Sequence, residues 1–197
     1  MSHDYLLARL PTLYADALRR PCTVDGFLRL VREADTRRWC AALLAWLGIA
    51  NAEAQHLGLP LPYPDAPVAE GVEAPGSAAW RAYYRRLQTL DAPPLLRAWA
   101  AEDAAVIAQR ARLAGADAGL EAGPVRAETH ALLAAAASAP FEAAAAGDRQ
   151  YLDAVFRRLD QRVAAVAPDA AVRVYAYAIR LLLLARLGIP LAYDDVA

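Results

Sequence analysis

The stretch VRVYAYAIRLLLLARL, residues 172–187, of this 197-residue chain contains the apolar run Leu181 to Ala185, which Arg180 and Arg186 close off. Large apolar residues recur in this stretch at helical spacing, and further apolar residues fill the remaining faces. The pattern predicts a helix that opens near Pro168 and is buried on nearly all sides, so we expect it at the centre of the fold.

The residues that follow this helix repeat an earlier segment of the chain. LGIPLAYDD, Leu187–Asp195, matches LGLPLPYPD, Leu57–Asp65, at six of nine positions, and a seventh position exchanges Leu for Ile. Each copy follows a helical stretch that contains an aromatic and basic cluster, at residues 27–30 and 156–159. The repeat predicts two related helical units, each ending in an extended Gly-Pro-Tyr-Asp tail. We expect the prolines and leucines to pin each tail against its own helix pair, with Tyr63 and Tyr193 in similar places.

The composition favours an all-α fold. Hydrophobic residues make up 58% of the chain, and many of them are alanine, the best helix former. Phenylalanine is scarce and β-branched residues are modest, whereas strands are rich in both kinds. We expect an array of about seven to nine helices, with an N-terminal unit at 1–65, a linker at 66–76 and a C-terminal unit at 77–197, packed as one globular domain.

Periodicity, caps and prolines predict the helix boundaries. The expected helices are 3–19 with a kink or a division into two short helices at Pro11, 25–48 after a cap at Thr23 or Asp25, 51–57, 77–90, 93–113, 124–137, 141–146, 148–163 and 168–187. Residues 58–76 form a Pro- and Gly-rich loop. Loops of this length are uncommon inside compact domains and are often functional.

The charge of the chain limits its partners. The net charge is −1, and all 21 basic residues are arginine. A nucleic-acid-binding protein needs a basic face, so this balance argues against that class. The arginines are scattered, which favours a coding bias over an arginine-selected binding surface. We find no signal-peptide pattern and no segment of membrane-spanning length, and therefore expect a soluble, cytoplasmic protein.

No metal or cofactor site is predicted. Glu53 and His56 form one Glu-x-x-His, but a di-iron site needs a second such pair and two more glutamates. Cys22 and Cys40 have no histidine at metal-ligand spacing, and we expect free thiols, with Cys40 in the core. A disulfide between the two cysteines is the alternative.

No catalytic motif is present either. The sequence has no Gly-x-Ser-x-Gly and no Gly-x-Gly-x-x-Gly, and the absence of lysine excludes a Walker motif and Schiff-base chemistry. Any enzymatic or small-ligand-binding role would need a pocket between the two units. Its candidate residues are His56, Tyr83, Tyr84 and His130.

The segment Trp80–Arg86 mixes aromatic residues with arginines. Such a mixture could stack on bases or anchor a protein partner. We favour the simpler interpretation of an amphipathic helix that buries its aromatic residues and leaves its arginines in solvent.

Acidic residues end each copy of the repeat, and further ones follow the first copy; we expect them to form the partner surface with the two repeat tyrosines. An acidic rim suits a basic partner. The candidate partner-binding residues are Tyr63, Asp65, Glu70, Glu73, Tyr193, Asp194 and Asp195, and Asp91, Glu102 and Asp103 could extend the rim. These acidic residues could equally be ordinary solvated ends of segments.

The C-terminal third resembles the closing helices of all-helical immunity proteins of bacterial polymorphic toxin systems, of the immunity protein 49 type. The resemblance rests on the small-residue, Gly147-Asp148 helix start, on Phe156–Leu159 and on the apolar helix that ends in Gly188-Ile189-Pro190. Tyr193-Asp194-Asp195 departs from the closing Tyr-Leu-Pro of that family. The resemblance implies a toxin-neutralising protein without catalytic residues. We therefore expect a non-enzymatic protein-binding module, monomeric or homodimeric, of the immunity or adaptor type.

Overall fold

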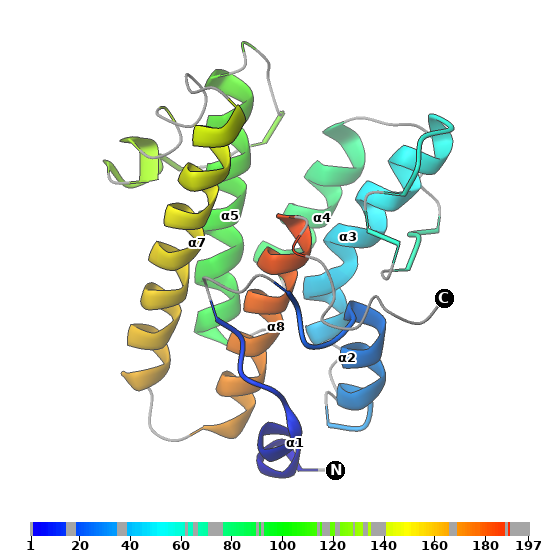
Figure 1. The fold of residues 1–197 in the computed structure, drawn as a ribbon, viewed down its shortest axis with the longest axis vertical. Helices are drawn as coiled ribbons and strands as arrows, with labels where there is room; N and C mark the ends of the chain where they lie inside the picture. Colours follow the sequence, from blue (N-terminus) through cyan, green and yellow to red (C-terminus); the bar gives the residue numbers. More distant parts are fainter. Residues whose placement is uncertain are drawn as a thin grey trace. The chain divides into compact units, whose positions relative to one another are not determined.

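The computed structural model is all-α, as the composition predicts. Its helices are α1 (His3–Arg9), α2 (Val24–Val31), α3 (Trp39–His56), α4 (Ser77–Thr89), α5 (Pro94–Leu113), α7 (Phe141–Ala164) and α8 (Ala170–Arg186) (Figure 1). The structure describes residues 2–14, 19–34, 39–61, 63–64, 67–70, 77–89, 91, 93–113, 115, 119–120, 123–127, 129–131, 134, 141–165, 169–187 and 189. No strand occurs within these ranges. Among the helices described there, none is both long enough and apolar enough to span a bilayer.

The chain forms two compact units whose limits differ from the expected division. Unit 1 comprises residues 1–75 and 159–197, and unit 2 comprises residues 76–158. The first boundary adjoins the expected linker at 66–76. The C-terminal segment, however, belongs with the N-terminal one, because the apolar helix α8 needs cover on all sides and α1, α2 and α3 provide it. Both copies of the nine-residue repeat therefore lie in unit 1.

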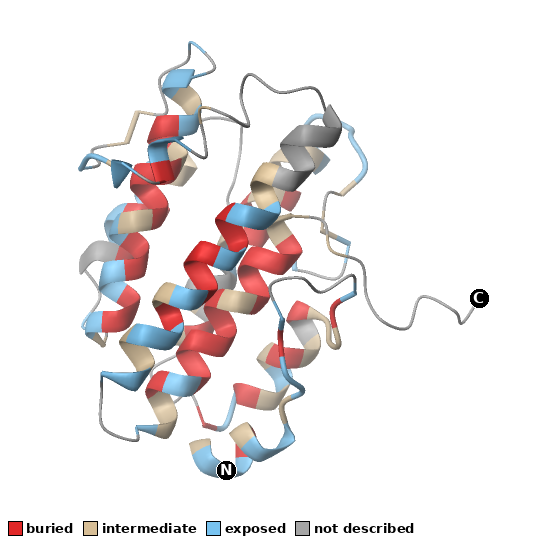
Figure 2. Cartoon of the chain, turned by 60° about the vertical axis from the view of Figure 1, so that its left-hand side comes forward, coloured by how far each residue is buried: buried red, intermediate tan, exposed pale blue. Residues whose placement is uncertain are grey.

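Helix α8 forms the centre of unit 1, as its sequence predicts. Twelve of its residues are buried, and they cover all faces of the helix. The Tyr175 ring meets the rings of His3 and Trp39 edge-on, at centroid distances of 6.3 and 5.3 Å. Figure 2 shows the general pattern: buried residues lie along the helices, whereas the described connecting segments are mostly exposed.

Helices α3 and α8 run in the same direction. Tyr175 on α8 contacts Trp39 at the start of α3. Arg186, three turns further along α8, lies over the ring of Trp46, two turns further along α3. Because the contacts advance together along both helices, the C-terminal ends of α3 and α8 point the same way (Figure 1).

The sequence repeat ends both of these helices in the same manner. Gly58 has a φ of +67°, and the Leu59 N–H donates to the Ala54 carbonyl at 2.9 Å. In the second copy the Ile189 N–H donates to the Leu184 carbonyl at 3.1 Å. Both bonds span five residues, which is the long bond of a Schellman helix cap. The repeat thus encodes two equivalent helix ends, while the predicted match between Tyr63 and Tyr193 involves a residue outside the described ones.

The first helix is shorter than expected. It was predicted to run to Arg19, but α1 ends at Arg9, and Leu10 adopts an extended conformation with ψ 128°. Pro11 explains the correction, because a proline disfavours helical geometry in the residue before it. Of the two alternatives expected at Pro11, the structure shows a short helix that ends before the proline and not a kinked one.

Two further boundaries depend on glycines. The expected helix 25–48 is two helices, α2 and α3, and α3 continues past Gly48 to His56. Likewise α7 continues through Gly147, where a break between two helices was expected. A glycine within a helix costs only about 1 kcal/mol relative to alanine, which the packing of a long helix outweighs.

Unit 2 is held by polar links between α4, α5 and α7. The Tyr84 hydroxyl donates to the buried carboxylate of Asp103 at 2.6 Å and so joins α4 to α5. Arg158 pairs with Glu102 at 2.7 Å, and Arg110 pairs with Asp148 at 2.8 Å. Arg110 lies further along α5 than Glu102, but its partner Asp148 lies earlier on α7 than Arg158. These two helices are therefore antiparallel.

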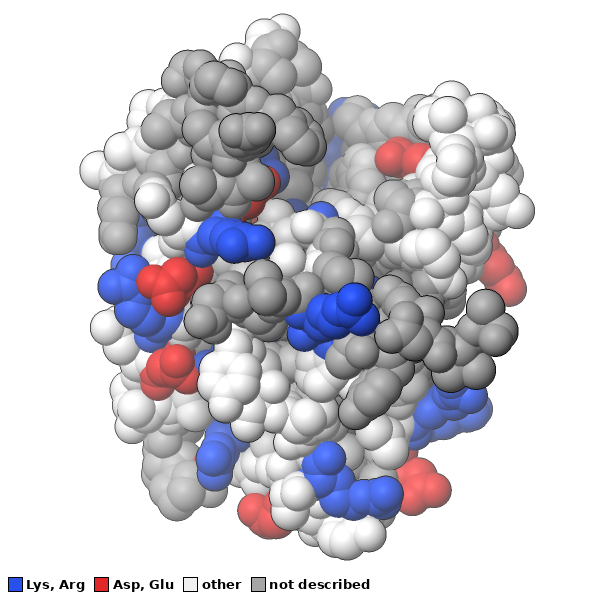
Figure 3. All heavy atoms as spheres, in the orientation of Figure 1, with Lys and Arg blue, Asp and Glu red and all other residues white. Residues whose placement is uncertain are grey.

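The Trp80–Arg86 segment is an amphipathic part of α4, as the simpler interpretation expects. Tyr83 and Tyr84 are buried, and Arg81, Arg85 and Arg86 are exposed. Figure 3 shows basic and acidic side chains interspersed over the face in view. On this face the mixture agrees with the scattered positions of the arginines in the sequence.

Both cysteines are free, as expected. Cys40 is buried, and the half-buried Cys22 places its Sγ 3.5 Å from the Tyr177 hydroxyl. The Tyr177 ring stacks on Phe27 at a centroid distance of 5.3 Å. Burial, followed by the contact with Cys22, raises the pKa of Tyr177 well above its ordinary value.

Alkaline pH should therefore destabilise the fold. The contribution of a neutral Tyr177 is fully present below about pH 10, where folded and unfolded chains both keep the proton, and is lost as the pH rises through the raised pKa. For one tyrosine this loss is at most about 1.4 kcal/mol per pH unit above 10. Urea unfolding of Tyr177→Phe at about pH 8 and 11 should show a weaker pH dependence than the native chain. Tyr5→Phe removes a phenol that is 55% exposed and is the control; equal pH slopes for the native chain and Tyr177→Phe would contradict the prediction.

Candidate protein interface

The loop that follows α3 is fastened to that helix by a buried asparagine. The Asn51 side chain is 0% exposed. Its Nδ2 donates to the Tyr63 carbonyl at 2.7 Å, and its Oδ1 accepts from the Tyr63 N–H at 3.0 Å. A side-chain amide can satisfy both backbone groups of one residue only in a fixed geometry. Asn51 therefore determines where the loop passes.

A second attachment lies one turn earlier on α3. The Ala69 N–H donates to the Gly48 carbonyl at 2.9 Å. A Cβ at Gly48 would lie 3.2 Å from both the Ala69 nitrogen and the Pro67 oxygen. The glycine within α3 thus permits the loop backbone to approach the helix. Gly48 therefore serves this contact and not the end of the helix.

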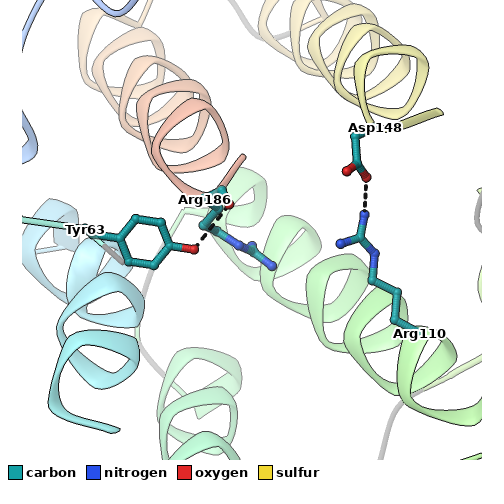
Figure 4. A network of polar contacts seen from close by, with 4 residues as sticks. All are labelled: Tyr63, Arg110, Asp148 and Arg186. Atoms are coloured by element: carbon teal, nitrogen blue, oxygen red, sulfur yellow. Dashed lines mark hydrogen bonds and ion pairs between the residues drawn. The ribbon is translucent and has the colours of Figure 1, made fainter. Parts of the chain in front are cut away.

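The Tyr63 side chain ties the loop to the end of α8. Its hydroxyl donates to the Arg186 carbonyl at 3.2 Å (Figure 4). Its ring meets Trp46 edge-on at 6.0 Å, and the Arg186 guanidinium lies 4.1 Å from the Trp46 ring centroid, within the range of a cation–π contact. Burial raises the pKa of Tyr63, and the nearby Arg186 charge opposes that rise. The phenol therefore stays protonated and able to donate at neutral pH.

Other residues of this segment expose large apolar side chains to solvent. Leu57 and Leu59 are each 57% exposed, and Val68 is 38% exposed. Glu70 is also exposed, as are three prolines, Pro60, Pro64 and Pro67. Exposed leucines on a well-anchored backbone are typical of a surface that contacts another molecule.

Only part of the predicted acidic surface can be placed. Glu70 is exposed beside the loop, and Tyr63 is half-buried, so it fixes the loop instead of presenting its ring to a partner. Glu102 and Asp103 are occupied inside unit 2 by Arg158 and Tyr84. The remaining predicted contacts lie outside the described residues: Asp65, Glu73, Tyr193, Asp194 and Asp195.

The residues of the alternative pocket have unlike surroundings. Tyr83 and Tyr84 are buried against each other in unit 2, with ring centroids 5.0 Å apart. His130 of unit 2 and His56 of unit 1 are both exposed. The structure thus joins two of the four candidates, and a small-ligand pocket that includes the histidines stays a prediction.

The described residues contain no group of three or more His, Cys, Asp or Glu side chains suited to a metal ion. His56 is exposed at the last position of α3, and Glu53 is half-buried one turn earlier. This placement agrees with a surface pair.

Sequence reasoning missed the residues that build this surface. Asn51 follows twelve residues of α3, Trp39–Ala50, that contain no charged or amide side chain, and that contrast was the available signal. Leu57 and Leu59 stand inside the repeat, but as apolar residues they were expected to pin the tail against its own helices. Nothing local in the sequence pairs Trp46 with Arg186, 140 positions later.

Comparisons with protein-family models, with curated proteins and with solved structures find no match to this chain. The resemblance to immunity proteins therefore stays a prediction.

Proposed function

We propose that this chain is a non-enzymatic protein-binding module of the immunity (toxin-neutralising) or adaptor type, which acts in the cytoplasm by direct contact with a protein partner. The single observation that carries the proposal is the segment after α3. Hydrogen bonds of Asn51 and Tyr63 fix this segment, and its residues Leu57 and Leu59 are exposed.

A pre-ordered loop suits binding because little conformational entropy is lost when the partner docks. Three hydrogen bonds from Asn51 and Tyr63 order this loop before any partner arrives. The prolines of the segment restrict it further. The loop therefore has the properties of a pre-formed protein-contact surface.

The sign of the charges supports a protein partner over a nucleic acid. Glu70, an acidic residue of this loop, is exposed, and the chain as a whole carries a net charge of −1. Phosphate backbones are repelled by such a surface. The alternative function, a helical enzyme or small-ligand-binding protein, has no comparable observation in its favour.

The test is co-expression with the product of the adjacent gene. If the immunity function is right, that product is a toxin, the full chain restores growth of cells that express it, and the two proteins elute together in size-exclusion chromatography. An adaptor would form the complex without protecting growth. Absence of both a complex and protection would contradict the proposed function.

A further inference from the structure

We propose that the partner presents a basic amphipathic surface, in which apolar side chains receive Leu57 and Leu59 and a flanking lysine or arginine faces the exposed carboxylate of Glu70. This inference rests on the proposed function and specifies the chemistry of the partner. Two independent observations carry it: the rigid exposure of the leucine pair and the charge of the surrounding segment.

The leucine pair, Leu57 and Leu59, stands on a rigid backbone. The Leu57 N–H donates to the Glu53 carbonyl at 3.1 Å, and the Leu59 N–H donates to the Ala54 carbonyl at 2.9 Å. Gly58 between them holds the left-handed conformation that ends the helix. The same bonds that end α3 therefore hold both leucines at the surface, where each is 57% exposed. Two apolar side chains on an ordered backbone can serve as anchors because this backbone loses little freedom on docking.

The segment around the leucine pair has no basic residue. All 21 arginines lie outside residues 39–80 in the sequence, and the acidic residues of this segment are Glu53, Asp65, Glu70 and Glu73, so its net charge is −4 with His56 neutral. Of these four, the structure describes Glu53, which is half-buried, and Glu70, which is exposed. Figure 3 agrees: described atoms over the C-terminal end of α3 and the loop after it, at the upper right, are uncharged or acidic. Arg186 reaches this loop from α8, but its guanidinium lies over the Trp46 ring. A basic partner complements this distribution of charge.

Other occupants fit less well. Anionic membrane surfaces attract basic segments and repel this one. An acidic partner would face like charge. A second copy of the chain could offer the arginines of α4, and the experiment below separates that case from a different basic protein.

The experiment is a selection from a phage-displayed library of random 16-residue peptides on the immobilised full chain. We expect the recovered peptides to be rich in lysine or arginine together with leucine, isoleucine or phenylalanine. A fluorescein-labelled copy of the strongest peptide should bind the Leu57→Ser/Leu59→Ser variant at least about tenfold more weakly than the native chain. The association rate of the peptide should also fall as the salt concentration rises from about 50 to about 300 mM, because salt screens the acidic segment. This range spans the ~0.1 M at which the Debye length is about 10 Å.

The matched control is Arg81→Gln/Arg85→Gln, which changes two exposed side chains of α4. It should bind the labelled peptide like the native chain. Because Leu57 and Leu59 are exposed, the double serine variant should keep the native melting temperature, and circular dichroism checks that it does.

Four results would overturn the inference. The first is that the recovered peptides are acidic, and the second is that the α4 control loses binding. The third is that every recovered peptide binds the serine variant as well as the native chain. The fourth is that the native chain is a dimer and the serine variant is a monomer. The last result would identify a second copy as the occupant. Each of these results is independent of the co-expression test, because co-elution with the adjacent gene product detects binding through any surface of the chain.

Discussion

Replacing Leu182 by Ala is expected to lower the free energy of unfolding by about 3 kcal/mol, the usual cost of removing a buried leucine side chain. Leu182 is 0% exposed at the centre of α8, which α1, α2 and α3 surround. The cavity would lie where these helices meet, so little collapse can fill it. For a chain of this length the melting temperature should fall by about 6 to 12 °C, measured by circular dichroism or calorimetry.

Leu57→Ala is the matched control for this change. It removes the same atoms from a side chain that is 57% exposed, so its effect should stay within about 0.5 kcal/mol. If Leu182→Ala proved as mild as the control, α8 would not be the centre of a tightly packed unit.

The position of α8 could be predicted from sequence because burial leaves a local signature. A helix that is apolar on every face has no stable place except among other helices. The amphipathic α4 was predictable for the same reason, since Tyr83, Tyr84 and Leu87 alternate with exposed arginines at helical spacing. The caps at Thr23 and Asp169 also follow local rules, because each side chain accepts a bond from its own helix start.

The errors occurred where distant segments meet. Gly48 was expected to end a helix, but it serves the approach of residues 67–69, some twenty positions away. The chain was expected to divide after residue 76, yet residues 159–197 return to the N-terminal unit. Local helix propensity does not predict which distant segments pack together, whereas the burial of α8 determines this packing.

The candidate interface was half predictable. The repeat and the Pro-rich loop directed attention to residues 57–65, and the loop does lie at the surface there. The exposure of Leu57 and Leu59 was not foreseen, because leucines beside prolines were expected to pack inward. Which face of a loop is exposed depends on its anchors, and the Tyr63–Arg186 anchor joins residues 123 positions apart.

Replacing Asn51 by Ala should release the loop and lower the free energy of unfolding by about 3 kcal/mol. The change removes two hydrogen bonds and leaves the Tyr63 N–H and carbonyl without their partner, and an unsatisfied buried polar group costs about 1–3 kcal/mol. Because the lost contacts all belong to one loop, part of the effect should be local. Hydrogen exchange should accelerate over residues 59–70 more than over α4 and α5.

Gln55→Ala is the control on the same helix, because the Gln55 side chain is an exposed amide. Its unfolding free energy should stay within about 0.5 kcal/mol of the native value. With a partner in hand, Asn51→Ala should also weaken binding although Asn51 itself is 0% exposed and cannot touch a partner. That outcome would show that the ordering of the loop, and not only its exposed leucines, contributes to affinity. Native affinity together with rapid exchange of residues 59–70 would show instead that the loop orders on the partner or lies outside the contact.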